Sequence, residues 1–237
     1  MKESGLKTAE QSSGRSNLKR WLVMIDKDNL LAEKADQKLD VDKFVKLISA
    51  DEVLRAEIVK QLLTNQKIMV YYHCYYIVDK ASQLQPGLFY QYWPEFALLL
   101  DHQNSYHRDI GLTIIANLTK VDQQDLFYDI FEDYFEHIND NKFMTAQCCV
   151  KNTAKIIKFK PALTDQIIEL LLEIDHKTNY PERQLALLKY GVLEVFEQVY
   201  PKTQFKKKIA SFIKAAVNSI SPKTRKKASQ LIKNLPL

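Results

Sequence analysis

The sequence is poor in glycine and proline and has no long apolar run. Only 5 glycines and 7 prolines occur among 237 residues, too few for the many tight turns of an all-β fold. The longest wholly apolar runs, such as residues 21–25, are far shorter than a membrane span. The stretch from Lys2 to Arg20 lacks the apolar centre of a secretory signal peptide. These absences favour a helical protein that is neither exported nor embedded in a membrane.

Cysteine is also scarce, and its placement suggests a compartment. Cys74, Cys148 and Cys149 cannot all pair within the chain, and two of them are adjacent. A disulfide framework is therefore not expected, and a reducing environment fits best. We expect a cytoplasmic protein.

Acidic residues are missing from the end of the chain. Lys202 to Leu237 carries ten Lys and Arg and no Asp or Glu, while residues 21–201 have a net charge near −8. Such a basic end attracts phosphates or an acidic protein. It also suits a terminal repeat that needs a polar outer face. The sequence leaves both alternatives open.

Helix signals recur with a period of about 39 residues. Expected starts of second helices are near Asn65, Ser105, Asn141, Tyr180 and Ser221, at intervals of 36 to 41 residues. A second set of turn residues repeats with the same period: Pro86, Asp122, Pro161 and Pro201. This periodicity predicts about five helical hairpins between residues 50 and 235. Short helices are expected before them at 18–35 and 41–48, with a capping box from Ser49 to Glu52.

These signals predict a flexible polar tail over residues 1–17 and a single domain over residues 18–237. Within that domain, charge separates by helix type. The expected first helices 123–138 and 162–175 carry acids and no base. The second helix 141–160 carries only bases, namely Lys142, Lys151, Lys155, Lys158 and Lys160.

The repeats resemble the HEAT family of armadillo-type folds. That family carries an acidic residue in the turn between its helices and an Arg or Lys early in the second helix, followed by a small residue. Arg108, Arg183 and Arg225 match this pattern, with Asp101, Asp175 and Asn218 in the preceding turns. The small residues Gly111, Ala146, Ala186 and Ala228 are expected to let second helices approach their neighbours. The resemblance implies a right-handed α-α superhelix, an all-α solenoid of about five HEAT-like hairpins plus the short N-terminal helices.

In such solenoids the second helices line the concave face, so the resemblance implies a partly basic groove. We expect its tentative basic surface to comprise Lys151, Lys155, Lys158, Lys223, Arg225, Lys226 and Lys227. Tyr72 and Tyr76 belong to the densest aromatic cluster and could contact a peptide or a base if exposed, although core packing is the more common role. The Asp–Arg ladder is expected to link successive turns through charge-assisted bonds.

No catalytic or metal motif is present in the sequence. The five histidines lack zinc-ligand spacing, with His102 and His107 expected at the surface, and there is no C-x-x-C and no phosphate loop. We expect no metal, no cofactor and no conventional enzyme. The favoured function is a non-catalytic scaffold that binds another protein or peptide in its concave groove.

The alternative function is nucleic-acid binding. HEAT-like alkylpurine DNA glycosylases have a similar length and hold DNA in a basic concave groove, so the resemblance extends weakly to them. Those enzymes share a Trp-Trp-Asp run. The nearest match in this chain is Tyr92-Trp93-Pro94-Glu95.

Overall fold

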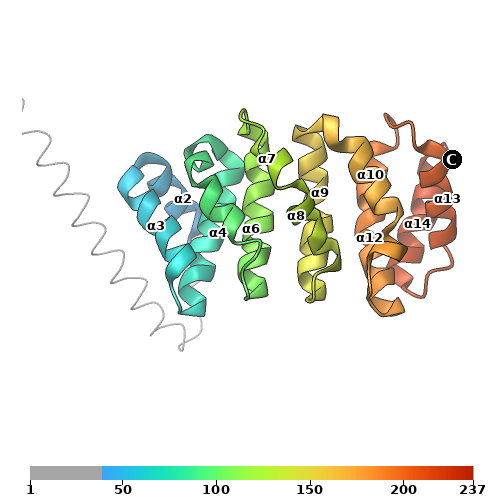
Figure 1. The fold of residues 1–237 in the computed structure, drawn as a ribbon, viewed down its shortest axis with the longest axis horizontal. Coiled ribbons are helices and arrows are strands. Elements are labelled where there is room, and N and C mark those ends of the chain that lie inside the picture. The colour runs from blue at the N-terminus through green and yellow to red at the C-terminus, as the bar shows by residue number, and fades with distance from the viewer. Residues whose placement is uncertain (1–38, 237) are drawn as a thin grey trace, which may run out of the picture. The chain divides into compact units, whose positions relative to one another are not determined.

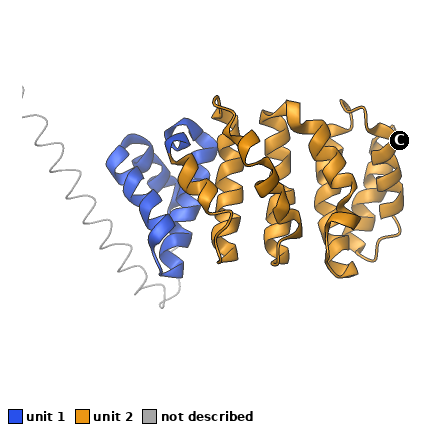
Figure 2. Ribbon diagram, in the orientation of Figure 1, with its two compact units in different colours: residues 1–91 blue, residues 92–237 orange. Residues whose placement is uncertain are grey.

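A computed structural model of the chain describes residues 39–236. Within this range thirteen α-helices and five short 3-10 helices occur and no β-strand, so the fold of the described residues is all-α, as predicted (Figure 1). The predicted tail over 1–17 and the predicted helix over 18–35 lie outside this range. None of the helices within it is long and apolar enough to cross a membrane. The chain divides into two compact units, one ending at Gln91 and the other beginning at Tyr92 (Figure 2).

The first unit contains three α-helices that pack on one another. They are α2 (Val41–Ala50), α3 (Glu52–Thr64) and α4 (Ile68–Leu84), followed by the 3-10 helices η1 (Pro86–Leu88) and η2 (Tyr90–Tyr92). Helix α2 confirms the short helix predicted at 41–48. Ile48, Ile58 and Ile77, one from each helix, are fully buried and form the centre of this unit.

The predicted capping box at Ser49 is wrong. The N-cap of α3 is Asp51, whose Oδ1 accepts a hydrogen bond of 3.0 Å from the backbone N–H of Leu54. Ser49 still belongs to α2, and its hydroxyl donates to the carbonyl oxygen of Val45 at 2.7 Å. A helical serine readily makes this bond to the carbonyl four residues earlier, and its side chain is then engaged in its own helix.

The second unit contains four successive helix pairs. The first elements of the pairs are α5 (Trp93–Leu98), α7 (Leu126–Asp129) with α8 (Phe131–Glu136), α10 (Thr164–Leu172) with α11 (Ile174–Lys177), and α13 (Lys206–Ala216). The second elements are α6 (Ser105–Leu118), α9 (Phe143–Phe159), α12 (Glu182–Val199) and α14 (Pro222–Asn234). The remaining 3-10 helices are η3 (Thr119–Val121), η4 (His137–Asn139) and η5 (Pro161–Leu163).

The second helices begin close to where the repeat predicted them. Helices α4, α6, α9, α12 and α14 start within three residues of the expected positions. Local chemistry explains this, since Asn104 and Ser221 cap α6 and α14 with their side chains. In the second unit α6 packs on α9, α9 on α12 and α12 on α14, so these helices form one continuous row (Figure 1).

Two of the predicted first helices are interrupted. The segment expected as one helix over 123–138 is divided at Ile130 into α7 and α8, and the segment 162–175 is divided at Glu173 into α10 and α11. Asp125 precedes α7 with a φ of 56°, a left-handed conformation that aspartate tolerates better than most residues. In both segments, apolar residues at helical spacing continue through the break. The sequence pattern therefore showed which residues are buried but not where the helices are interrupted.

Two glycines permit close helix contacts, but only one of them lies between neighbouring second helices. A Cβ at Gly191 would lie 2.9 Å from Cγ1 of Val150 in α9. A Cβ at Gly111 would lie 2.9 Å from Cβ of Leu99 and 3.1 Å from the carbonyl oxygen of Phe96. Gly111 therefore lets α6 approach a neighbouring helix closely, as expected, and that neighbour is α5, the first helix of its own pair.

Gly111→Ala is expected to lower the free energy of unfolding by about 1–3 kcal/mol, the usual effect of overpacking against atoms that cannot move aside. Gly191→Ala serves as the matched comparison and is expected to lose less stability. The end of the Val150 side chain can shift away, and alanine gains about 1 kcal/mol of helix propensity over glycine. Urea denaturation of both variants measures the difference. Equal losses would show that backbone contact at Gly111 is not the deciding factor.

Candidate binding surface

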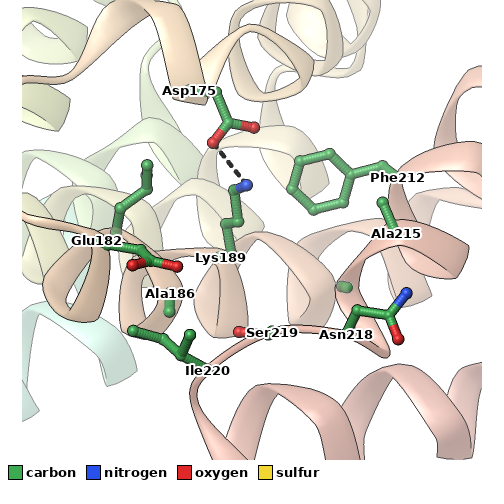
Figure 3. A pocket seen from close by; sticks show the side chains of 11 residues that line it. Asp175, Glu182, Ala186, Lys189, Phe212, Ala215, Asn218, Ser219 and Ile220 are labelled. Carbon is green, nitrogen blue, oxygen red and sulfur yellow. Dashed lines mark ion pairs between the residues drawn. The ribbon is translucent and has the colours of Figure 1, made fainter.

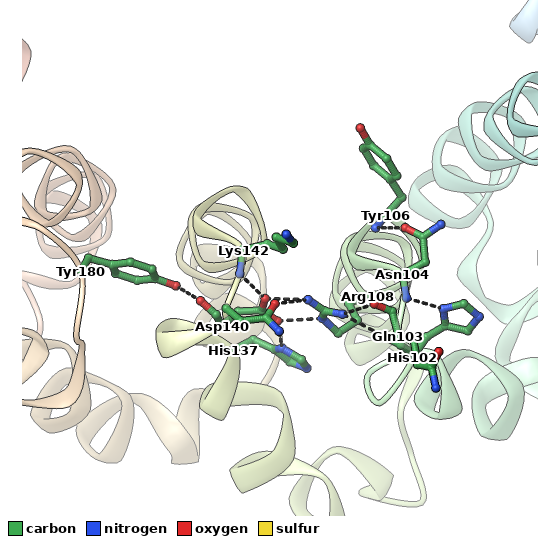
Figure 4. A network of polar contacts seen from close by, with 10 residues as sticks. His102, Gln103, Asn104, Tyr106, Arg108, His137, Asp140, Lys142 and Tyr180 are labelled. Atoms are coloured by element: carbon green, nitrogen blue, oxygen red, sulfur yellow. Dashed lines mark hydrogen bonds and ion pairs between the residues drawn. The ribbon is translucent and has the colours of Figure 1, made fainter.

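Arg108 and Asp140 join the turns of two successive helix pairs. Nε and Nη2 of Arg108 donate to the two carboxylate oxygens of Asp140 at 2.8 and 2.7 Å (Figure 4). Nη1 of Arg108 donates to the carbonyl oxygens of His102 and Gln103 in its own turn. Both side chains are almost completely buried, at 9% and 4% exposure. This arrangement is a bidentate ion pair that also holds the α5–α6 turn.

Asp140 is also bonded to groups from its own and the following helix pair. Its carboxylate accepts from the N–H of Lys142 and contacts Nδ1 of His137 at 2.8 Å, and its carbonyl oxygen accepts from the hydroxyl of Tyr180 (Figure 4). Burial by itself would raise the pKa of Asp140, but hydrogen bonds from Arg108 and Lys142 outweigh it and lower that pKa below its usual value. The sequence pattern placed Asp101 before Arg108 and did not assign Asp140 as the partner of this arginine.

The expectation that His107 lies at the surface is wrong. His102 is exposed, but His107 is buried, and the two rings stack with their centroids 4.2 Å apart. Burial, together with the nearby His102, lowers the pKa of His107. Burial begins in the first turn of α6, so a residue only three positions from the N-cap Asn104 is already inside.

The other predicted ladder residues do not repeat the Arg108 arrangement. Asp101 is exposed. Asp175 forms an ion pair of 2.5 Å with Lys189 rather than with Arg183, and within the described residues Arg183 is exposed and makes no ion pair. Asn218 is exposed beside Arg225, whose Nη1 donates to the carbonyl oxygens of Ser219 and Ile220 at 2.7 and 3.1 Å.

Helix α9 presents lysines on one exposed face. Lys151 and Lys158 are exposed, and Lys155 between them is half-buried and donates to Oδ1 of Asn117 in α6 at 2.8 Å. The i, i+4, i+7 spacing places the three on one side of the helix, as predicted from the sequence. Lys160, counted with these bases in the sequence, does not belong to the surface, because it is buried at 6% exposure. Its Nζ lies 2.8 Å from Asp122 and 2.6 Å from Asp125.

The lysines of α14 face partners on α12. Nζ of Lys227 forms an ion pair of 2.7 Å with Glu197, and Nζ of Lys223 lies 3.7 Å from the ring centroid of Tyr190. The hydroxyl of Tyr190 in turn donates to Glu194. Lys226 is exposed. Because α12 packs between α9 and α14, its residues Glu194 and Glu197 separate the lysines of α9 from those of α14.

The predicted aromatic pair lies in the first unit, on α4. Tyr76 is 50% exposed, and Tyr72 is half-buried with its ring centroid 6.1 Å from that of Tyr76. Tyr71 in the same cluster is buried at 2% exposure. The cluster is therefore divided between the core and the surface, and Tyr76 offers the largest free area.

A pocket of about 330 Å³ opens beside α12 in the second unit. Its apolar wall comes from Leu185, Phe212 and Ile220, and the ion pair of Asp175 with Lys189 lies at its margin (Figure 3). Nζ of Lys189 lies 5.7 Å from the ring centroid of Phe212. The sequence did not single out this pocket, since its walls come from α12, α13 and the turn after α13.

The first helices present an acidic surface in the second unit. The exposed carboxylates are those of Asp129, Glu132, Asp133 and Glu136 on α7 and α8 and of Asp165, Glu169, Glu173 and Asp175 on and beside α10 and α11. A shallow hollow of about 400 Å³ between Glu132, Glu136 and Lys177 lies on this side. The charge of this acidic surface is opposite to that of the lysine face on α9.

Nucleophilic and metal-binding chemistry has little support in residues 39–236. No group of three or more His, Cys, Asp or Glu side chains there is arranged to hold a metal ion. Burial raises the pKa of Cys74 to about 12 and that of Cys148 to about 11, so both thiols are protonated at neutral pH. Trp93, the nearest match to the glycosylase tryptophans, is only 3% exposed.

No family model matches the chain, and no curated protein or solved structure is significantly similar to it.

Proposed function

We propose that the helix pairs form a HEAT-like α-solenoid and that the protein is a non-catalytic module that binds another protein or a peptide. The continuous packing of α6, α9, α12 and α14 supports a layer of second helices, the layer that lines the concave side of such solenoids. Its exposed residues on α9, α12 and α14 would then form the binding face. Stacked helix pairs of this kind provide extended surfaces for partners.

The observation that carries the proposal is the alternation of charge on this face. Lys151 and Lys158 on α9 are followed by Glu194 and Glu197 on α12, and Glu197 already neutralises Lys227 on α14. A polyanion that followed the lysines would meet the two glutamates and be repelled. A protein partner can place charges of both signs, and Met144, which is 66% exposed at the start of α9, adds apolar area.

A photo-crosslinking amino acid at Met144 tests this proposal in cells. Discrete protein adducts are expected from position 144 and none from Asp133, an exposed control residue on the opposite helix layer. Glu194→Lys is expected to reduce the adducts by about tenfold, because reversal of an interface charge costs roughly 1–2 kcal/mol. Identical adduct patterns at positions 144 and 133, or adducts unaffected by Glu194→Lys, would contradict the proposal.

Nucleic-acid binding is the second candidate, and the exposed Lys151 and Lys158 of α9 favour it. The test is fluorescence anisotropy with labelled duplex and single-stranded DNA and RNA at about 50 and 200 mM salt. Lys151→Glu with Lys158→Glu is the cleanest variant, because Lys155 is bonded to Asn117 and its replacement would also disturb α6. We expect no binding tighter than about 10 μM at the higher salt. Tight binding that falls steeply with salt and disappears in the double variant would replace the protein-binding proposal.

A further inference from the structure

The end of the described chain carries a basic surface on α13 and α14, which shares α14 with the proposed binding face. Lys206, Lys207, Lys208 and Lys214 on α13 and Lys223, Arg225, Lys226 and Lys233 on α14 are all exposed. No acidic residue occurs from Lys202 onward to neutralise them. Arg225 is two positions from both Lys223 and Lys227, which places it about 200° around α14 from them. It therefore does not point toward α12, where those two lysines have their partners.

Arg225 repeats half of the arrangement that Arg108 makes. In both cases Nη1 donates to the carbonyl oxygens six and five residues earlier, at 2.8 and 3.1 Å for Arg108 and at 2.7 and 3.1 Å for Arg225. These two bonds fix the guanidinium plane against its own turn. The edge formed by Nε and Nη2 is consequently held in the same local orientation in both residues.

The two arginines differ at that second edge. Arg108 uses Nε and Nη2 to hold both carboxylate oxygens of Asp140, and Nη2 also donates to Oδ1 of Asn141 at 3.0 Å (Figure 4). Among the described residues, Nε and Nη2 of Arg225 have no acceptor, and the residue is exposed. The guanidinium is thus already in the orientation that suits a carboxylate. Its bonds to the turn have already restricted the side chain, so bidentate binding costs little further side-chain entropy.

We infer that Arg225 is the centre of a docking site for an acidic segment of a partner protein. A carboxylate of that segment binds across Nε and Nη2 as Asp140 binds Arg108, and Lys226 beside it adds attraction. The match to the Asp140 contact of Arg108 favours a carboxylate as the group bound at this edge. The inference rests on the geometry of Arg225 and not on the alternating charges of α9 and α12 that carry the proposed function.

The probe is a ten-residue peptide of Gly and Ser that carries one Asp-Asn pair. The control is the same peptide with Asn-Asn in place of Asp-Asn, which removes the carboxylate. Nitrogen-15 NMR of the full chain follows the arginine Nε–H resonances during titration. The Arg225 resonance is expected to shift with the Asp peptide and not with the Asn peptide. The Arg108 resonance serves as an internal control, because its edge is already occupied by Asp140.

Arg225→Lys is expected to weaken binding of the Asp peptide by about tenfold, because lysine keeps the charge and loses the bidentate edge. Arg183→Lys, the same change at an exposed arginine on α12, should leave it unaffected. Lys226→Gln leaves the bonds of Arg225 to its turn intact and should weaken binding about threefold, which keeps the test valid if Arg225→Lys disturbs folding.

Three results would overturn the inference. One is an unchanged Arg225 resonance at millimolar Asp peptide, and another is equal affinity of the wild type and Arg225→Lys. The third is that a ten-nucleotide single strand binds more tightly than the Asp peptide and that Arg225→Lys and Arg183→Lys reduce this affinity equally. That result would show that the surface binds phosphates through its charge alone.

Discussion

Replacing Asp140 with alanine is expected to lower the free energy of unfolding by about 3–5 kcal/mol. The change removes the carboxylate from a guanidinium that is 9% exposed and leaves Arg108 buried with a charge that only carbonyl and amide oxygens contact. It also removes the hydrogen bond to the N–H of Lys142 at the start of α9. Guanidinium chloride denaturation measures the loss.

Asp175→Ala is the matched control for this prediction. Asp175 also belongs to the turn region of a helix pair and also forms an ion pair, but its side chain is 44% exposed and that of Lys189 is 25% exposed. Exposed pairs contribute less than about 1 kcal/mol. Asp140→Ala combined with Arg108→Ala should be less destabilised than the sum of the two single changes. Additive losses would mean that the two side chains do not act as a pair.

The loss of stability at acid pH also tests the ion pair of Arg108 and Asp140, because it depends on the pKa of Asp140. That pKa is lowered in the folded state, whereas an unfolded aspartate has a pKa of about 3.9. The stabilisation is therefore fully present above about pH 4 and is lost as the pH falls through the lowered folded value. Burial raises the pKa of Asp109 and acts in the opposite direction, so the wild type is compared with Asp140→Asn. A steeper acid loss in the wild type is expected, and parallel curves would contradict it.

Lys160→Met is expected to lower the free energy of unfolding by about 3 kcal/mol. Nζ of Lys160 lies 2.8 Å from the carboxylate of Asp122, whose side chain is completely buried, and it also donates to the carbonyl oxygen of Asp122. The same carboxylate accepts from the N–H groups of Leu126 and Phe127 at the start of α7. Without the lysine, a buried carboxylate would lose the counter-charge that lies 2.8 Å from it.

Lys158→Met is the control for this change, since Lys158 lies on the same helix and is exposed. It should alter stability by no more than about 0.5 kcal/mol. Asp122→Asn is expected to restore part of the stability lost in Lys160→Met, because an amide needs no counter-charge. Equal effects of Lys160→Met and Lys158→Met in urea denaturation would show that the buried pair contributes nothing.

The positions of the second helices followed from the sequence because their signals are local. A cap such as Ser221 followed by Pro222 acts within one turn of chain, and the apolar stripes repeat within each helix. Burial follows the same helical spacing, since Phe127, Phe131 and Tyr134 recur every three or four residues and all are buried. The lysine face of α9 also followed from helical spacing alone.

The partners of charged side chains did not follow from the sequence, because they depend on residues 30 to 40 positions away. Arg108 and Asp140 are 32 residues apart, and Lys160 and Asp122 are 38 apart. Helical spacing placed Lys158 and not Lys160 on the lysine face, but nothing in the sequence indicated that Lys160 is buried. The same holds for His107, whose burial results from packing around the start of α6.

The sequence by itself determined that this chain is helical, where its second helices begin and which faces of them are apolar, because propensity, capping and periodicity act over a few residues. Only the tertiary structure decided which charges are neutralised and which stay available. The carboxylate of Asp140 binds the Nε–Nη2 edge of Arg108, and Glu197 forms an ion pair with Lys227. Among the described residues, the same edge of Arg225 has no acceptor, and Lys151 and Lys158 are exposed. The physical reason is that an ion pair forms only between groups that packing brings within about 4 Å, and the packing of one helix pair on the next sets that distance.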